Sequence, residues 1–124
     1  MAMPVVQNHA ISPEDLQRER RCLNAQVARV GFNPTLLGKA LDLAAGWICR
    51  EIDPLAEGAR RAARRYVAQL LSYRAVRKGI SSVERKRREA LERTRREMIK
   101  KGIDDGHITK LSQDIAGQTP GLGG

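Results

Sequence analysis

Residues 33–52, NPTLLGKALDLAAGWICREI, constrain the fold most, because they form the most apolar run in a chain of which 30% is charged. Apolar side chains recur through this run in two rows at helical spacing, and the rows together cover more than one stripe. Asn33 can cap the helix and Pro34 fits its first position, so we expect a central helix with neighbours on several sides. The run is too short and too charged to cross a membrane. The small residues that would let another helix approach closely are Gly38, Ala44, Ala45 and Gly46.

The segment before this helix carries its own start and stop. Ser12 is suited to cap a helix, and Pro13 to occupy its first position. Gly31 favours a stop, because glycine readily adopts the left-handed backbone conformation that ends helices. The apolar stripe in between is narrow and is interrupted by Arg20. We therefore expect a peripheral helix with one docked edge, preceded by an extended or disordered, flexible arm over residues 1–11 that lacks the features of a signal peptide.

A third helix is predicted from Pro54 to about Lys78, because Asp53 and Pro54 repeat the cap-and-proline pattern. On a helical wheel its apolar side chains share one arc, which indicates an amphipathic helix. The residues of that arc are Leu55, Ala59, Ala62, Ala63, Tyr66, Val67, Leu70 and Tyr73. The cations placed opposite the arc are Arg60, Arg61, Arg64, Arg65 and Lys78.

A fourth helix is predicted to begin at Ser81, where Ser81 and Glu84 fit a capping box, and to end at Gly102. Its apolar stripe is thin, so much of its surface should lie in water. Each glutamate has a basic residue four positions later, the orientation that stabilises a helix by about 0.2–0.5 kcal/mol per pair. The expected pairs are Glu84–Arg88, Glu89–Arg93, Glu92–Arg96 and Glu97–Lys101.

Residues 103–124 differ from the rest of the chain. Asp104, Asp105 and Gly106 indicate a turn, one short amphipathic piece follows, and the closing GQTPGLGG is rich in helix breakers. We expect either a flexible tail or a peptide that becomes ordered on a partner.

These patterns together predict one all-α domain: four helices over residues 12–102, an arm over residues 1–11 and a tail over residues 103–124. No alternating strand pattern is present, and aromatic residues make up only 3% of the chain. Cys22 and Cys49 lie on apolar-leaning faces, so we expect two reduced, buried thiols; a disulfide or a reactive thiol is the alternative.

The sequence contains no recognisable catalytic constellation. The histidines and cysteines fall at positions 9, 22, 49 and 107, which match no metal-binding spacing. No glycine-rich phosphate loop is present either. We therefore expect no enzyme activity, no cofactor and no metal.

The net charge of +9 is concentrated in one segment. Residues 53–102 contain 16 basic and 6 acidic residues, whereas residues 1–52 contain 6 and 5, and residues 103–124 contain 1 and 3. Two interpretations carry equal weight: a surface that binds phosphates, or a solvated face laced with ion pairs. A third use is docking on an acidic protein. The candidate contact residues are Arg60, Arg61, Arg64, Arg65, Arg85, Lys86, Arg87, Arg95 and Lys100.

Residues 34–124 also resemble a known family in the order of their segments: LGKALDLAAGWICREID, then RRAARRYVAQLLSYRAVRKG, then SSVERKRREALERTRREMIKKGI, then a loose tail. This order is similar to that of head–tail connector (adaptor) proteins of tailed bacteriophages. The resemblance implies a subunit that forms a ring beneath the portal and docks on it through residues 103–124. The apolar side chains that would dock are Ile108, Leu111, Ile115 and Leu122.

The leading functional hypothesis is therefore a non-enzymatic assembly protein that forms homo-oligomers and binds a portal-like protein. The alternative is a basic helical protein of a mobile element that binds DNA or RNA through the arginine-rich faces of its third and fourth helices. Neither hypothesis involves a membrane, and both place the protein in the cytoplasm or the virion.

Overall fold

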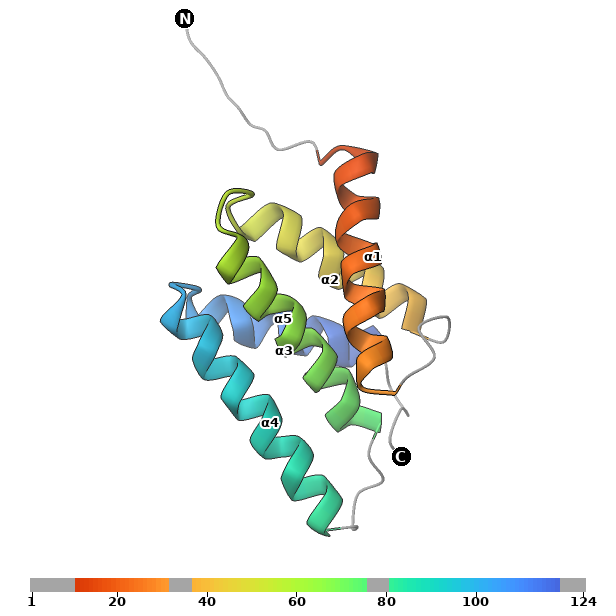
Figure 1. Ribbon diagram of the computed structural model, residues 1–124, viewed down its shortest axis with the longest axis vertical. Helices are drawn as coiled ribbons and strands as arrows, with labels where there is room; N and C mark the ends of the chain where they lie inside the picture. The colour runs from red at the N-terminus through yellow and green to blue at the C-terminus, as the bar shows by residue number, and fades with distance from the viewer. Residues whose placement is uncertain (1–10, 32–36, 76–80, 119–124) are drawn as a thin grey trace, which may run out of the picture.

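The structure, a computed structural model, describes residues 11–31, 37–75 and 81–118, and within them the chain is all-α (Figure 1). The described part contains five helices and no strand: α1 (Pro13–Arg29), α2 (Gly38–Glu51), α3 (Glu57–Ala75), α4 (Ser81–Lys100) and α5 (Asp105–Gln118). The all-α prediction is confirmed, whereas the predicted number of four helices is wrong. The additional helix is α5, which occupies the segment predicted to be a tail.

The ends of α1 follow the sequence prediction closely. Ser12 caps the helix, because its Oγ accepts a hydrogen bond from the backbone N–H of Asp15 at 3.1 Å. Pro13 occupies the first turn. Gly31 has a φ of 93°, a left-handed conformation in which glycine is strongly favoured, so the chain turns away after α1.

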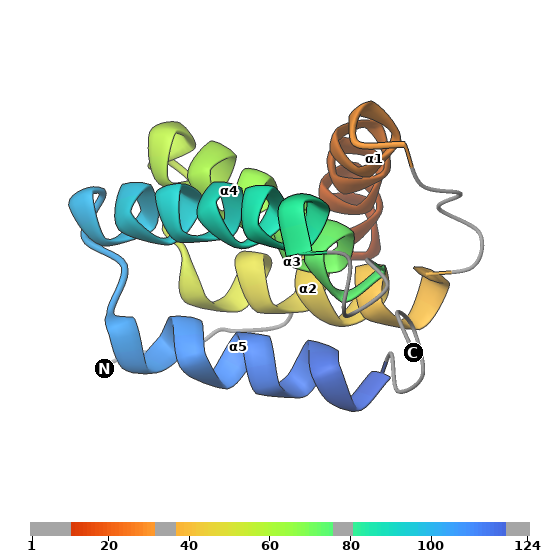
Figure 2. The same ribbon diagram turned by 90° about the horizontal axis from the view of Figure 1, so that it is seen from below.

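Helix α2 lies between α1 and α5 and also contacts α3 (Figure 2). Seven of its 14 residues are buried, which confirms the prediction of a central helix with several neighbours. The predicted cap at Asn33 and Pro34 lies outside the described residues. Gly46 was predicted to let another helix approach. The atom nearest to a Cβ at this position would instead be Nη1 of Arg50, from the same helix, at 3.0 Å.

Helix α3 starts later than predicted and is buried on more sides. Oδ1 of Asp53 accepts the N–H of Leu55 at 2.9 Å, and the N–H of Ala56 donates to the carbonyl of Asp53 at 3.0 Å. This turn leaves Leu55 90% exposed, so its assignment to the apolar arc is wrong. Because α3 packs against α1, α2 and α4, residues outside that arc, such as Ala68 and Leu71, are also fully buried.

Helix α4 packs mainly on α3 at the edge of the molecule (Figure 1). Met98 is its fully buried anchor, whereas Val83 and Ile99 are 42% and 45% exposed. The expectation that much of this helix lies in water is therefore confirmed.

The junction between α4 and α5 corrects the tail prediction. Gly102, at φ 90°, and Ile103 donate hydrogen bonds to the carbonyls of Ile99 and Met98, a glycine-based helix stop. Asp104 then acts as a cap instead of forming a simple turn, since its Oδ2 accepts the N–H of His107 at 3.2 Å. A new helix thus begins where the sequence indicated a break.

The three apolar side chains predicted to dock on a partner are instead part of the core. Ile108, Leu111 and Ile115 are fully buried, because α5 turns back and lies along α2. Their helical spacing gives α5 a single apolar stripe, which the apolar surface of α2 covers. Leu122 lies outside the described residues.

Candidate functional site

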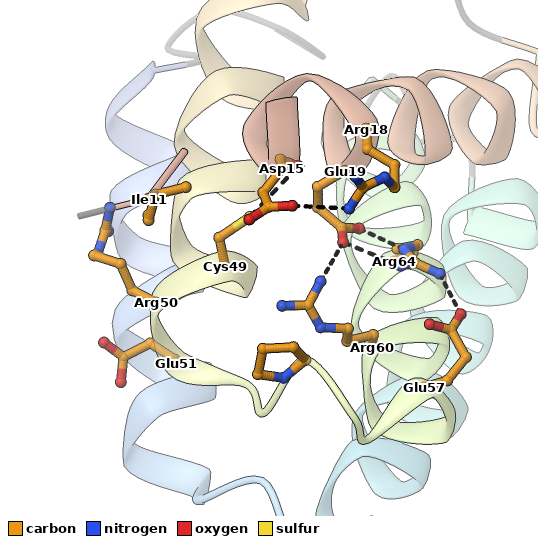
Figure 3. A pocket seen from close by; sticks show the side chains of 11 residues that line it. Ile11, Asp15, Arg18, Glu19, Cys49, Arg50, Glu51, Glu57, Arg60 and Arg64 are labelled. Carbon is orange, nitrogen blue, oxygen red and sulfur yellow. Dashed lines mark hydrogen bonds and ion pairs between the residues drawn. The ribbon is translucent and has the colours of Figure 1, made fainter. Parts of the chain in front are cut away.

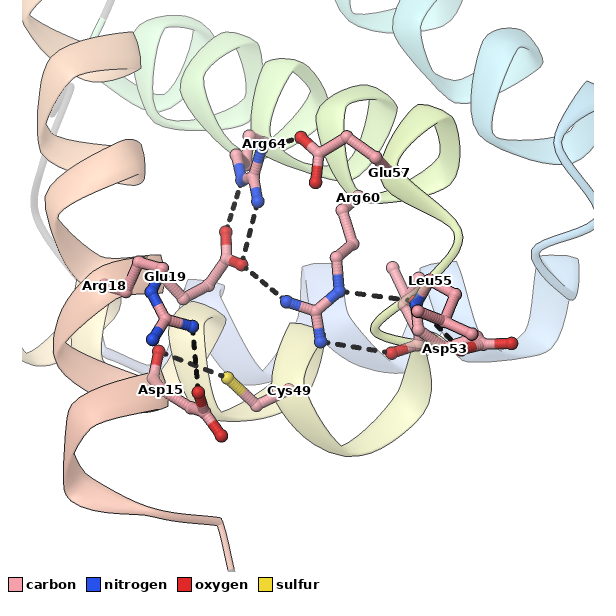
Figure 4. Close-up of polar contacts among 10 residues, drawn as sticks. Asp15, Arg18, Glu19, Cys49, Asp53, Leu55, Glu57, Arg60 and Arg64 are labelled. Atoms are coloured by element: carbon pink, nitrogen blue, oxygen red, sulfur yellow. Dashed lines mark hydrogen bonds and ion pairs between the residues drawn. The ribbon is translucent and has the colours of Figure 1, made fainter.

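Two of the arginines predicted to form an outer cationic face on α3 point inward. Arg60 and Arg64 are only 13% exposed, and both pair with Glu19 of α1, which is 2% exposed (Figure 4). Nη1 of Arg60 lies 3.0 Å from Oε1 of Glu19, and Nη2 of Arg64 lies 3.0 Å from the same oxygen. Nε of Arg64 binds the other carboxylate oxygen.

The other nitrogens of these two guanidinium groups also make hydrogen bonds. Arg60 donates to the backbone carbonyls of Ile52 at 3.3 Å and Asp53 at 3.4 Å, and Arg64 donates to Glu57 at 2.8 Å. A phosphate approaching here would compete with the carboxylates of Glu19 and Glu57, which already neutralise these arginines. We therefore assign Glu19, Arg60 and Arg64 a structural role: they join α1 to α3 and to the turn before α3.

The cluster borders an open cleft of about 640 Å³ between α1, the end of α2 and the start of α3 (Figure 3). Its charged lining is balanced, with four arginines and four carboxylates. These residues are Arg18, Arg50, Arg60, Arg64, Asp15, Glu19, Glu51 and Glu57. A balanced lining gives an anion or a cation little net attraction, so the cleft is a poor candidate for a charged ligand.

Cys49 also lines this cleft, but it is not set up as a nucleophile. Its Sγ lies 3.9 Å from the backbone carbonyl of Asp15. Burial raises the pKa of the Cys49 thiol, which keeps it protonated and weakly nucleophilic. Cys49 and Cys22 are both free, as predicted, but both are half-buried, whereas the sequence predicted buried thiols.

Two further candidate cations are also paired between helices. Nη2 of Arg65 lies 3.0 Å from Oε1 of Glu97 on α4. Nε of Arg95 lies 3.1 Å from Oδ1 of Asp105 at the start of α5. Four of the candidate contact residues, Arg60, Arg64, Arg65 and Arg95, are therefore already paired with carboxylates. A helical wheel shows neighbours within one helix and not those on adjacent helices.

The side of α4 that faces away from α3, hereafter the outer face of α4, carries an excess of exposed cations. Its six basic residues are Arg85, Lys86, Arg88, Arg93, Arg96 and Lys100. Glu89 and Glu92 are its two carboxylates, and Arg88, Arg93 and Arg96 line a shallow hollow around them. The salt bridges found in the described part of the chain include none of the six cations.

This face differs from the sequence prediction in several residues. Arg85, Lys86 and Lys100 are among the predicted contact residues, whereas Arg88, Arg93 and Arg96 were expected to pair with the glutamates four positions before them. Of the remaining candidates, Arg87 is half-buried and Arg61 lies exposed on α3.

The buried carboxylate of Glu19 was not predicted at all. It lies within the apolar stripe of α1, three residues after Leu16 and four before Leu23, and that position could have revealed it.

The described residues contain no group of three or more histidines, cysteines or carboxylates placed to hold a metal ion. Among the same residues, no helix combines the length and apolar character needed to cross a membrane. No family model matches the chain, and no curated protein or solved structure matches it either.

Proposed function

We propose that this protein binds nucleic acid through the outer face of α4. The observation that carries the proposal is the set of six exposed cations and two carboxylates on one side of a helix that packs mainly on α3. An exposed excess of positive charge attracts a polyphosphate backbone at long range and releases counterions on binding. The other predicted basic face, on α3, does not contribute in this way, because three of its four arginines are held in ion pairs.

The dimensions of the face support the proposal. At a rise of about 1.5 Å per residue, the cations from Arg85 to Lys100 extend over roughly 22 Å. Duplex DNA carries one phosphate per about 1.7 Å of its axis, so several phosphates lie within reach. Backbone contacts of this kind give affinity that falls steeply with salt and does not depend on sequence.

The test compares two variants that lose the same charge from different surfaces. One carries Lys86→Gln, Arg93→Gln and Lys100→Gln on α4, and the control carries Arg21→Gln, Arg29→Gln and Lys39→Gln on α1 and α2. We expect the α4 variant to reduce the slope of log affinity against log salt by up to about 0.9 per cation removed, and the control to reduce it little. Equal slopes for the two variants would assign binding to net charge and not to this face.

A second candidate function is a subunit of a homo-oligomeric assembly, such as a phage head–tail connector. Its main support is the order of segments, and Leu55, which is 90% exposed in the turn before α3, offers one apolar side chain to such a contact. Docking through Ile108, Leu111 and Ile115 would require α5 to leave the core, so any docking tail is confined to residues 119–124.

Sedimentation of the full chain, of a chain ending at Gln118 and of a Leu55→Ser variant tests this candidate. An assembly of the full chain that is lost in either variant supports the connector-like function. If the full chain remains monomeric at high concentration, both alone and with a portal-like partner, the connector-like function is contradicted.

A further inference from the structure

The two glutamates on the outer face of α4 indicate how that face would meet its ligand; this inference rests on the proposed function. At 3.6 residues per turn, Glu89 and Glu92 lie near the middle of the face. Arg88 lies on one flank of this pair and Arg93 on the other. Arg85 and Arg96 lie before and after the pair along the axis. The result is a pair of carboxylates with cations on every side, around a shallow hollow.

This pattern does not suit a helix that lies flat along a single row of phosphates. The carboxylates would then approach phosphate oxygens, and like charges at short distance repel. The cations on the two flanks can instead reach two separate rows of phosphates. In that arrangement the carboxylates lie over the gap between the rows, where no phosphate is present.

A groove of duplex DNA has this geometry. The major groove of B-form DNA is about 12 Å wide and admits an α-helix, whose diameter with side chains is about 10–12 Å. Base edges at the floor of that groove include the amino group of cytosine, from which a glutamate can accept a hydrogen bond. The major groove of A-form RNA is deep and narrow and does not admit side chains in this way.

Binding to single strands lacks support in the described part of the chain. Such binding commonly stacks bases on exposed aromatic side chains. Here Trp47 is 5% exposed, Tyr66 is 1% exposed and Tyr73 is half-buried.

We infer that α4 binds lengthwise in the major groove of duplex DNA, with its flanking cations on the two phosphate backbones and Glu89 and Glu92 facing the base edges. Arg88 would reach one backbone, and Lys86, Arg93 and Lys100 the other. Arg85 and Arg96 would extend the contacts along the groove.

The first experiment measures the affinity of the full chain for one sequence as duplex DNA, duplex RNA and single-stranded DNA at fixed salt. We expect duplex DNA to bind at least about tenfold more tightly than either of the others, and the protein to protect guanine N7 in the major groove from methylation. Equal affinity for the two duplexes, or unprotected N7, overturns the groove inference and leaves the proposed function standing. No binding to any of the three overturns both.

The second experiment removes the two carboxylate acceptors with a Glu89→Ala, Glu92→Ala double variant, whose helical circular dichroism confirms folding. Selection from random duplexes should enrich C·G pairs for the unmodified chain, and the double variant should lose that enrichment. If the double variant instead binds all duplexes more tightly and to the same extent, the glutamates face phosphates and the inference fails.

Discussion

At the scale of single residues, Glu19 is the side chain on which the packing of α1 against α3 depends most. It is 2% exposed and accepts hydrogen bonds from both Arg60 and Arg64, which are themselves 13% exposed. Removing one partner of a buried ion pair leaves charges uncompensated in a medium that solvates them poorly. Loss of Glu19 should therefore destabilise the fold more than loss of an exposed ion pair of similar length.

We predict that Glu19→Gln lowers the free energy of unfolding by about 3–5 kcal/mol, because Arg60 would lose its counter-charge and Arg64 would keep only that of Glu57. Urea unfolding followed by circular dichroism measures the change. The matched control is Glu14→Gln on the exposed side of the same helix, which should change stability by less than about 1 kcal/mol because it loses only an exposed interaction with the helix dipole. Similar effects of the two substitutions would show that the buried cluster contributes no special stability.

Cys49 gives a second prediction at this scale. Burial raises the pKa of its thiol, so less thiolate is present at mildly alkaline pH than in the unfolded chain. In a Cys22→Ser background, we expect Cys49 to react with iodoacetamide at least about tenfold more slowly in the folded protein than in denaturant. A folded thiol that reacts as fast as the unfolded one, or faster, contradicts this account.

Features of α1 and α3 differ in how well they could be predicted from the sequence. The cap at Ser12 and the stop at Gly31 were predictable, because they depend on neighbours a few positions away. The partners of Arg60 and Arg64 were not, because Glu19 precedes them by about forty residues and meets them only once α1 packs on α3. The helical wheel placed both arginines opposite the apolar arc, where side chains were expected to face water.

At the scale of helices, α5 shows that a weak sequence pattern can still form part of the core. Three apolar residues, Asp104 as a cap and the stop at Gly102 are enough, since α2 offers an apolar surface that covers the stripe. Sequence reasoning identified the stripe and the breaking residues. Sequence reasoning could not predict that α1 and α3 would leave one side of α2 free for α5, because that depends on where α1 and α3 pack.

We predict that Leu111→Ala lowers the free energy of unfolding by about 2–5 kcal/mol, as expected when a fully buried leucine is truncated. The exposed Gln113→Ala on the same helix is the control and should change it by less than about 0.5 kcal/mol. A chain ending at Asp104 should lose cooperative thermal unfolding. If it unfolds like the full chain, α5 is not part of the core.

Two glycine substitutions, one at the stop after α4 and one inside α5, test the assignment of the stop at Gly102. Gly102 has a φ of 90°, so Gly102→Ala should destabilise the protein by about 1 kcal/mol because the Cβ strains a left-handed residue. Gly117 lies in α5 with nothing within 4 Å of a built Cβ, so Gly117→Ala should be neutral or stabilise by up to about 1 kcal/mol. The thermal midpoint should therefore fall for Gly102→Ala and stay the same or rise for Gly117→Ala, and a Gly102→Ala variant whose midpoint does not fall would refute the assignment of the stop at Gly102.

At the scale of the whole molecule, charge is divided between two uses. Arginines of α3 and Arg95 of α4 join helices through carboxylates, whereas the outer face of α4 keeps its cations exposed. The net charge of +9 and its concentration in one segment could be counted from the sequence. Which cations remain exposed could not, because it depends on which helix lies at the edge.

That division predicts how the molecule responds to acid. Hydrogen bonds from Ser12 and Arg18 lower the pKa of Asp15, and Arg64 lowers the pKa of Glu57. A carboxylate with a lowered folded pKa contributes stability that is present above its ordinary value, here 3.8 and 4.5, and that is lost as the pH falls through the folded value. Protonation also removes the negative charges that hold the net charge down to +9, so repulsion among the cations grows.

We therefore predict that the free energy of unfolding falls below about pH 4.5, and falls less in high salt because salt screens the repulsion. Urea unfolding from pH 7 to pH 2 at two salt concentrations measures this. Glu57→Gln should be less stable than the unmodified chain at pH 7, and the difference should shrink to zero as acid protonates Glu57. A difference that stays constant or widens as the pH falls would mean that Arg64 gains no stability from Glu57 and depends on Glu19 alone.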